Sequence, residues 1–142
     1  MLFNIFLTPS FIILFLLNPI KNINKDYISV KINNTDFSME VANTQYKKAL
    51  GLMYKSFKNT KGMVFIYNKP TIPIYYNKNV KFPLRIYFLD ADFKVVSSFV
   101  MQKNSFKTYK PKSKINYVVE VPLKEDLSND FGDFPKILLD IN

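Results

Sequence analysis

The chain has 142 residues, which is enough for one domain with a substantial core but not for two. It contains no Cys and no His, which excludes disulfides, thiol or imidazole catalysis, and the nitrogen and sulfur ligands of a zinc site. The net charge is +9, but the lysines are spread along the chain without a basic helix or an RNP-like strand. We therefore expect no nucleic-acid partner.

The first element, residues 1–20, is strongly apolar and is followed directly by Lys21. Its densest part, residues 11–17, has the length of a signal-peptide hydrophobic region but is too short to span a membrane alone. A basic start and a small-residue cleavage site are both missing. We predict an export signal or an uncleaved membrane anchor rather than a buried helix, with the rest of the chain extracytoplasmic. A polar linker, residues 21–26, then precedes a single domain over residues 27–142.

From Tyr27 onward, apolar and polar residues alternate mostly with a period of two, which is typical of half-buried strands. Asn33 and Asn34 tolerate positive φ and predict a hairpin turn. Thr44 is predicted to cap a helix over residues 45–54, in which Gly51 either ends the helix or is packed closely by a neighbour. Strands are expected over residues 27–32, 37–41, 63–67, 72–77, 84–89, 94–101, 117–121 and 134–141.

This pattern predicts a mainly β fold with one short helix, either an antiparallel β-sandwich or an open barrel of about eight short strands. Pro73 indicates that its strand lies at an edge. Residues 102–115 are expected to form a long basic loop, which is either an anion-binding loop or a solvated one. Its lysines are Lys103, Lys107, Lys110, Lys112 and Lys114.

Several short phrases, spaced in a fixed order, carry a family resemblance. They are Val41-Ala42-Asn43-Thr44, Lys48, Gly51-Leu52-Met53, Gly62-Met63-Val64-Phe65, Lys78-Asn79, Phe82-Pro83-Leu84 and Phe88-Leu89-Asp90. In this order they resemble the bacterial and archaeal family called domain of unknown function 192, over roughly residues 28–140. The resemblance implies a small, mostly β sandwich or barrel, often preceded by an export signal. It implies no particular reaction, because the role of that family is not established.

The residues of these phrases expected to shape the backbone are Gly51, Met53, Gly62, Met63, Pro83 and Asp90. The chain also departs from the family pattern at five positions. It has Lys48 for Arg, Tyr76 for Trp, Asn77 for Met, Arg85 for Asp and Phe93 for Gly. If the family shares a ligand site, these departures predict that the site is altered or lost here.

One cluster of side chains is a candidate ligand site: Thr44, Lys48, Tyr75, Tyr76, Lys78 and Asn79. Aromatic faces beside amide and ammonium donors suit a sugar ring or an anionic small molecule. The alternative is structural, with Tyr75 and Tyr76 closing a barrel end while Lys78 and Asn79 shape a turn.

A second candidate set holds the carboxylates Asp90, Asp92, Glu120 and Asp133. Two of them facing a cleft would suit a glycosidase, whereas a hairpin in which Asp residues bind their own backbone explains Asp90 and Asp92 more simply. Met53 and Met63 would be weak ligands for a soft metal, because the chain has no His or Cys to complete the site. The favoured interpretation is that both side chains fill space in the core. We predict no metal and no cofactor.

The sequence thus favours a non-catalytic, extracytoplasmic, monomeric domain that binds a small ligand or an envelope partner through the edge formed by residues 76–79. The alternative hypothesis is a carboxylate-dependent hydrolase that acts on envelope carbohydrate.

Overall fold

The computed structural model describes residues 23–142, in which strands dominate. These are β1 (Tyr27–Ile32), β2 (Thr35–Ala42), β3 (Met63–Thr71), β4 (Tyr75–Asn77), β5 (Leu84–Leu89), β6 (Val95–Met101), β7 (Ser105–Tyr109), β8 (Ile115–Pro122) and β9 (Ile137–Leu139). The helix α2 spans Gln45–Leu50, and one 3-10 turn, η1, spans Phe57–Asn59. The predicted export segment, residues 1–20, lies outside the described residues. Within residues 23–142, no helix combines the length and the hydropathy needed to cross a bilayer.

The strands form a seven-stranded sheet in the order β6-β5-β8-β3-β2-β1-β9 and a separate two-stranded sheet of β4 and β7. The mainly β prediction is confirmed. One pairing differs from the antiparallel expectation: β2 and β3 are parallel, with Val41 opposite Val64. Parallel neighbours need a long connection that returns the chain to its starting end. Here that connection contains α2 and η1.

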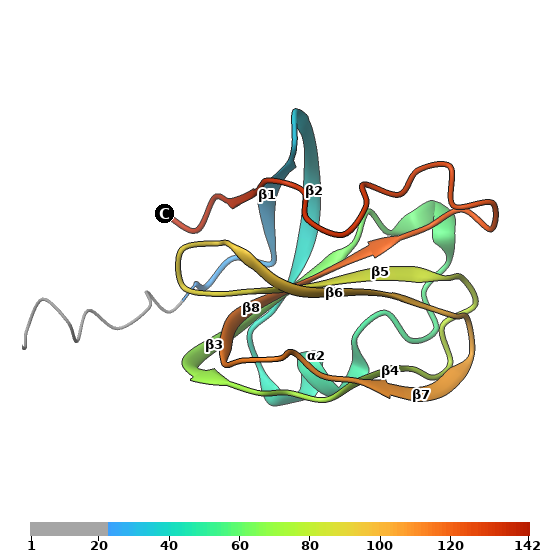
Figure 1. Cartoon of the computed structure of the whole chain (residues 1–142), viewed down its shortest axis with the longest axis horizontal. Coiled ribbons are helices and arrows are strands. Elements are labelled where there is room, and N and C mark those ends of the chain that lie inside the picture. The colour runs from blue at the N-terminus through green and yellow to red at the C-terminus, as the bar shows by residue number, and fades with distance from the viewer. Residues whose placement is uncertain (1–22) are drawn as a thin grey trace, which may run out of the picture.

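Two hydrophobic cores lie on opposite faces of the central strands β3, β5 and β8. In Figure 1 the β1–β2 hairpin rises on one side of these strands, while α2, β4 and β7 lie on the other. Alternate side chains of β5 therefore enter different cores. Tyr87 and Leu89 belong to the first core, on the side of the β1–β2 hairpin. Ile86 and Phe88 belong to the second core, on the side of α2, β4 and β7. This double coverage explains why every residue of β5 and of β8 is buried.

The two glycines of the motif phrases are needed for different structural reasons. Gly62 has φ +128°, and a Cβ there would lie 2.4 Å from the carbonyl oxygen of Glu120, so two backbone segments approach closely at this position. Gly51 has φ +51°, and a Cβ there would make ordinary contact, 3.6 Å from the Phe65 ring. Gly51 ends α2, and its N–H donates to the carbonyl of Lys47. The helix therefore stops at Leu50 rather than continuing to Tyr54.

The structure also differs from one predicted loop and from two predicted strands. The predicted loop 102–115 contains β7, which pairs with β4 through Tyr109 opposite Tyr75; its polar, lysine-bearing sequence hid the strand. The predicted strand 72–77 is shortened to β4, since Pro73 has no N–H to donate. The last strand covers only Ile137–Leu139 of the predicted 134–141.

Residues 23–26, the described part of the predicted linker, lie against the domain. The Ile23 side chain belongs to the first core, and the Asn43 amide donates to the carbonyl of Ile23 at 2.5 Å. The Lys25 ammonium donates to the carbonyl of Asn142 at 2.6 Å. Both ends of the described chain are therefore held together on one side of the fold.

Candidate functional site: the Glu120 cavity

A cavity of about 190 Å³ lies between the second-core face of the sheet and the segment that contains α2. We call it the Glu120 cavity. Its polar lining side chains come from α2 (Lys48), β3 (Tyr67), β4 (Tyr75, Tyr76 and Asn77) and β8 (Glu120). Three residues of the predicted ligand cluster, Lys48, Tyr75 and Tyr76, therefore meet at one place.

Glu120 is the carboxylate of this cavity. Along β8, Val119 and Val121 enter the first core, so the side chain of Glu120 faces the opposite side, where the cavity lies. Glu120 is only 4% exposed, and burial raises its pKa to about 8. Near neutral pH the folded protein therefore holds mainly the neutral carboxyl group, which both donates and accepts a hydrogen bond.

Two tyrosine hydroxyls stand in the same cavity. The hydroxyls of Tyr67 and Tyr75 share a hydrogen bond with an O–O distance of 2.6 Å. The Tyr75 ring is fixed by an edge-on contact with Phe65, with ring centres 5.1 Å apart. Burial raises the pKa of both tyrosines, so both remain protonated at neutral pH. The pair therefore offers a rigid donor–acceptor group.

Lys48 places a positive charge at the same site. It is half-buried on α2, and its ammonium nitrogen lies 4.3 Å from the centre of the Tyr67 ring, within the range of a cation–π contact. Burial lowers the pKa of Lys48. Tyr76, which is 44% exposed, is the most open aromatic ring of the lining. The cavity thus presents a cation and an aromatic face as well as the buried acid.

Two further features bear on what the cavity can hold. A Cβ at Gly51 would lie 4.0 Å from Glu120 Oε2, so the missing side chain leaves space beside the carboxyl group. The Asn77 amide nitrogen donates to the carbonyls of Phe82 and Gln102. Asn77 Oδ1 is buried and has no hydrogen-bond partner within residues 23–142. This acceptor is available to a donor on a ligand.

The other three predicted ligand residues lie elsewhere and have structural contacts. Thr44 caps α2, where its hydroxyl accepts from the N–H of Lys47. The ammonium of Lys78 lies 5.6 Å from the centre of the Phe106 ring. Asn79 has φ +58° and donates to the Tyr54 hydroxyl, so it shapes a turn, as the structural alternative expected.

Sequence reasoning did not place Tyr67 or Glu120 in the ligand cluster. A usable signal existed for Glu120, because it is the only charged residue in the apolar run Ile115–Pro122. An acid at an interior position of a fully buried strand indicates a group kept for a purpose other than packing. Tyr67 gave no such signal, since an aromatic residue in a strand is ordinary.

Comparison with known proteins identifies the family. The model of the family described as Uncharacterized ACR, domain of unknown function 192 (DUF192), matches residues 28–125. The chain belongs to the DUF192 family. It is 32% identical over 104 residues to the UPF0127 protein PH1112 of Pyrococcus horikoshii, an alignment that covers 67% of this chain and 83% of that protein.

Two solved structures share the DUF192 fold of this chain. One, from Sinorhizobium meliloti, is described as a proposed transcription regulator. Its TM-score is 0.69 at 18% sequence identity, and the superposition covers 80% of this chain and 93% of that protein. The other is a protein of unknown function from Novosphingobium aromaticivorans, with a TM-score of 0.66 at 21% identity over 79% of this chain and 84% of its own. At these identities the likeness concerns the fold alone.

Two departures from the DUF192 pattern have local explanations. Arg85, in place of Asp, binds the Asp130 carboxylate through Nε and Nη2 and the Asp133 carboxylate through Nη1 at 2.8 Å. The guanidinium of Arg85 in turn lowers the pKa of Asp130. Phe93, in place of Gly, has φ +63°, and its ring centre lies 5.1 Å from that of Tyr117. The backbone strain there is offset by aromatic packing.

The remaining candidate carboxylates do not join Glu120. Asp90 accepts from the backbone N–H groups of Asp92 and Lys94, as expected for a hairpin, and Asp133 binds Arg85. None of the three candidate aspartates lines the Glu120 cavity. Met63 is buried in the second core and Met53 packs against it, so both fill space there. Among residues 23–142, no group of three acidic, His or Cys side chains is placed to hold a metal ion.

Proposed function

We propose that this DUF192 chain is a non-catalytic binding domain that takes one small polar ligand into the Glu120 cavity. The observation that supports this most strongly is the Glu120 carboxyl group, which is buried beside open space. Burial raises its pKa, and within the described part of the chain no hydrogen bond or cation opposes this shift. A fold that keeps an acid at such a cost, without pairing it, has a reason other than stability.

The chemistry of the lining indicates the class of ligand. The neutral carboxyl and the tyrosine pair exchange hydrogen bonds with hydroxyl groups, while Lys48 attracts a negative charge. A cavity of about 190 Å³ has room for about six waters at ~30 Å³ each. These features favour a compact hydroxylated molecule, either a small sugar or a hydroxy acid whose carboxylate meets Lys48.

The alternative hydrolase receives less support. A two-carboxylate mechanism needs a second acid roughly 5 to 10 Å from the first. Among residues 23–142, Glu120 is the one carboxylate in this lining. We therefore retain binding as the proposed function.

We also propose that the domain acts outside the cytoplasm, on the basis of the apolar residues 1–20. Fractionation of the native cells, with mass measurement of the purified chain, tests this directly. Recovery of the unprocessed chain in the cytosolic fraction would overturn export, and it would leave the binding proposal standing.

Ligand binding is tested by thermal unfolding of the full chain against glucose, galactose, glycolate, lactate and tartrate at millimolar concentration. At least one is expected to raise the Tm, because a ligand that binds only the folded state stabilises it. Lys48→Met should reduce the shift for the hydroxy acids. The matched control is Lys58→Met, an exposed lysine outside the cavity, which should leave the shift unchanged. If no compound raises the Tm, or if both variants behave alike, the proposed site is refuted.

A further inference from the structure

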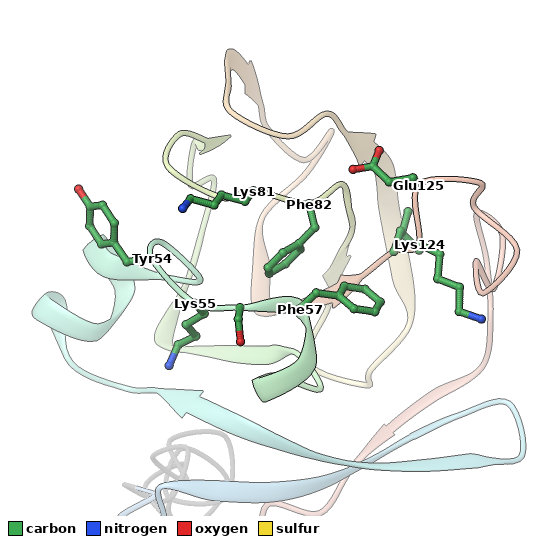
Figure 2. A pocket seen from close by; sticks show the side chains of 9 residues that line it. Tyr54, Lys55, Phe57, Lys81, Phe82, Lys124 and Glu125 are labelled. Atoms are coloured by element: carbon green, nitrogen blue, oxygen red, sulfur yellow. The ribbon is translucent and has the colours of Figure 1, made fainter.

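A second hollow lies apart from the Glu120 cavity, with a volume of about 550 Å³. It runs along η1, the residues just before β5, and the chain that leaves β8. We call it the η1 groove. Figure 2 shows the rings of Phe57 and Phe82 together at its centre, with Lys81 and Lys124 on opposite sides of them. The groove and the Glu120 cavity have no lining residue in common.

The floor of the η1 groove is apolar and rigid. Phe57 and Phe82 meet edge to face, with ring centres 5.8 Å apart. Phe82 is buried, whereas Phe57 remains 40% exposed. Leu123, which is 1% exposed, is held by a hydrogen bond from its N–H to the carbonyl of Pro83. An aromatic ring left open over a fixed apolar floor is a surface that gains free energy when it is covered.

The rim of the groove carries unbalanced positive charge. Lys55 is already paired with Glu40 at 2.7 Å, and Glu125 is paired with Lys103 at 2.9 Å. Lys81 and Lys124 are exposed, and within residues 23–142 no carboxylate oxygen lies within 4.0 Å of either ammonium group. An occupant with a negative group at one end is therefore favoured over a neutral or a cationic one.

Part of the backbone around the groove is already hydrogen-bonded within the fold. The N–H groups of Tyr54, Lys55 and Leu123 donate to carbonyls within the fold, and the N–H of Lys124 donates to the Asn129 side chain. These four N–H groups are therefore not available to the carbonyls of a bound peptide. A hydrocarbon chain needs no hydrogen-bond partner, so it can cover the apolar floor without them.

We propose that the η1 groove binds a free, single-chain carboxylate amphiphile, a medium-chain fatty acid, with its acyl chain over Phe57, Phe82 and Leu123. Its carboxylate lies at the rim and pairs with Lys81 or Lys124. This site is independent of the Glu120 cavity, so either can fail while the other stands.

The test uses the full chain and dodecanoate labelled with ¹³C at the carboxyl carbon, titrated below its micellar concentration and followed by NMR. Wild type is expected to bind it and to bind dodecyltrimethylammonium about tenfold more weakly, because the chain is the same and the charge is reversed. The variant K81E/K124E should lose about tenfold in dodecanoate affinity. Phe57→Ser should weaken the binding of both amphiphiles.

Three controls keep the outcome decisive. K69E/K110E changes the net charge by the same amount at exposed lysines outside the groove and should bind dodecanoate like wild type. Glu120→Gln should also bind it like wild type. Far-UV circular dichroism and the Tm confirm that each variant is folded.

Equal loss in the two double variants would mean that net charge alone is responsible, and this would overturn the proposal. Equal affinity for the two amphiphiles would overturn it as well. If phosphatidylglycerol vesicles bind wild type and K81E/K124E equally and compete dodecanoate away, the amphiphile has bound elsewhere and the groove is excluded.

Discussion

Glu120→Gln is the variant that tests the electrostatics of the cavity most directly. Burial raises the pKa of Glu120 to about 8 in the folded protein, against an ordinary value of 4.5. Between these two pH values the unfolded chain carries an ionised Glu120, whereas the folded chain keeps it protonated. Rising pH therefore favours unfolding over this window. Glutamine has nearly the same shape and no proton to lose, so the variant lacks this dependence.

The size of the effect follows from the two pKa values. Within the window, wild type loses about 1.4 kcal/mol of stability per pH unit relative to Glu120→Gln. Between about pH 5.5 and pH 8 the difference in the free energy of unfolding should change by about 3 kcal/mol in favour of the variant. Any difference in packing or hydrogen bonding between acid and amide adds a constant offset that leaves this change intact.

The assay is equilibrium urea unfolding of both proteins at several pH values, followed by far-UV circular dichroism. Other titrating groups cancel when the two curves are subtracted. Glu125→Gln is the control, because it makes the same acid-to-amide substitution at an exposed side chain and should give a nearly flat difference. If the Glu120→Gln difference is also flat, then Glu120 is ionised in the folded state, and the neutral carboxyl on which the proposed cavity chemistry depends does not exist.

Two further substitutions test the fold. Gly62→Ala should cost more than about 3 kcal/mol, since its methyl group would meet the carbonyl oxygen of Glu120 at 2.4 Å. Gly132 also has a positive φ, but no atom of residues 23–142 lies within 4 Å of a Cβ placed there, so Gly132→Ala should cost about 1 kcal/mol. Similar losses for the two variants in urea unfolding would show that crowding at Gly62 is unimportant. Arg85→Gln should cost about 3 kcal/mol, because it removes a buried guanidinium and leaves the Asp130 carboxylate, only 15% exposed, without its charged partner. The exposed control Lys103→Gln should cost under 1 kcal/mol. Since Arg85 lowers the pKa of Asp130, the Arg85→Gln loss should shrink below about pH 4, and a loss that stays constant down to pH 2 would contradict the ion-pair explanation.

The β-rich fold could be predicted from the sequence because most strands show either alternating apolar and polar residues or a continuous apolar run. The prediction failed at β7, where five mostly polar residues pair only because β4 lies beside them. It also failed to find the parallel pairing of β2 and β3. Register between strands depends on contacts across the sheet, and local propensity does not report them.

The candidate site was half predictable for a related reason. Lys48 belongs to the motif phrases, Tyr75 and Tyr76 lie shortly before the phrase Lys78-Asn79, and the structure brings the three side chains together. Glu120 and Tyr67 reach the same cavity from strands that are adjacent in space, which only the sheet order reveals. Asn79 resembled a ligand residue because turns and binding sites draw on the same residue types.

The parallel pairing of β2 and β3 shapes more than the sheet. Had those strands run in opposite directions, a turn of a few residues would have joined them. Instead, twenty residues must travel between Ala42 and Met63, and that detour supplies Lys48 and Gly51 to one hollow and Tyr54 and Phe57 to the other. This single connection therefore contributes one side of each of the two hollows for which binding is proposed.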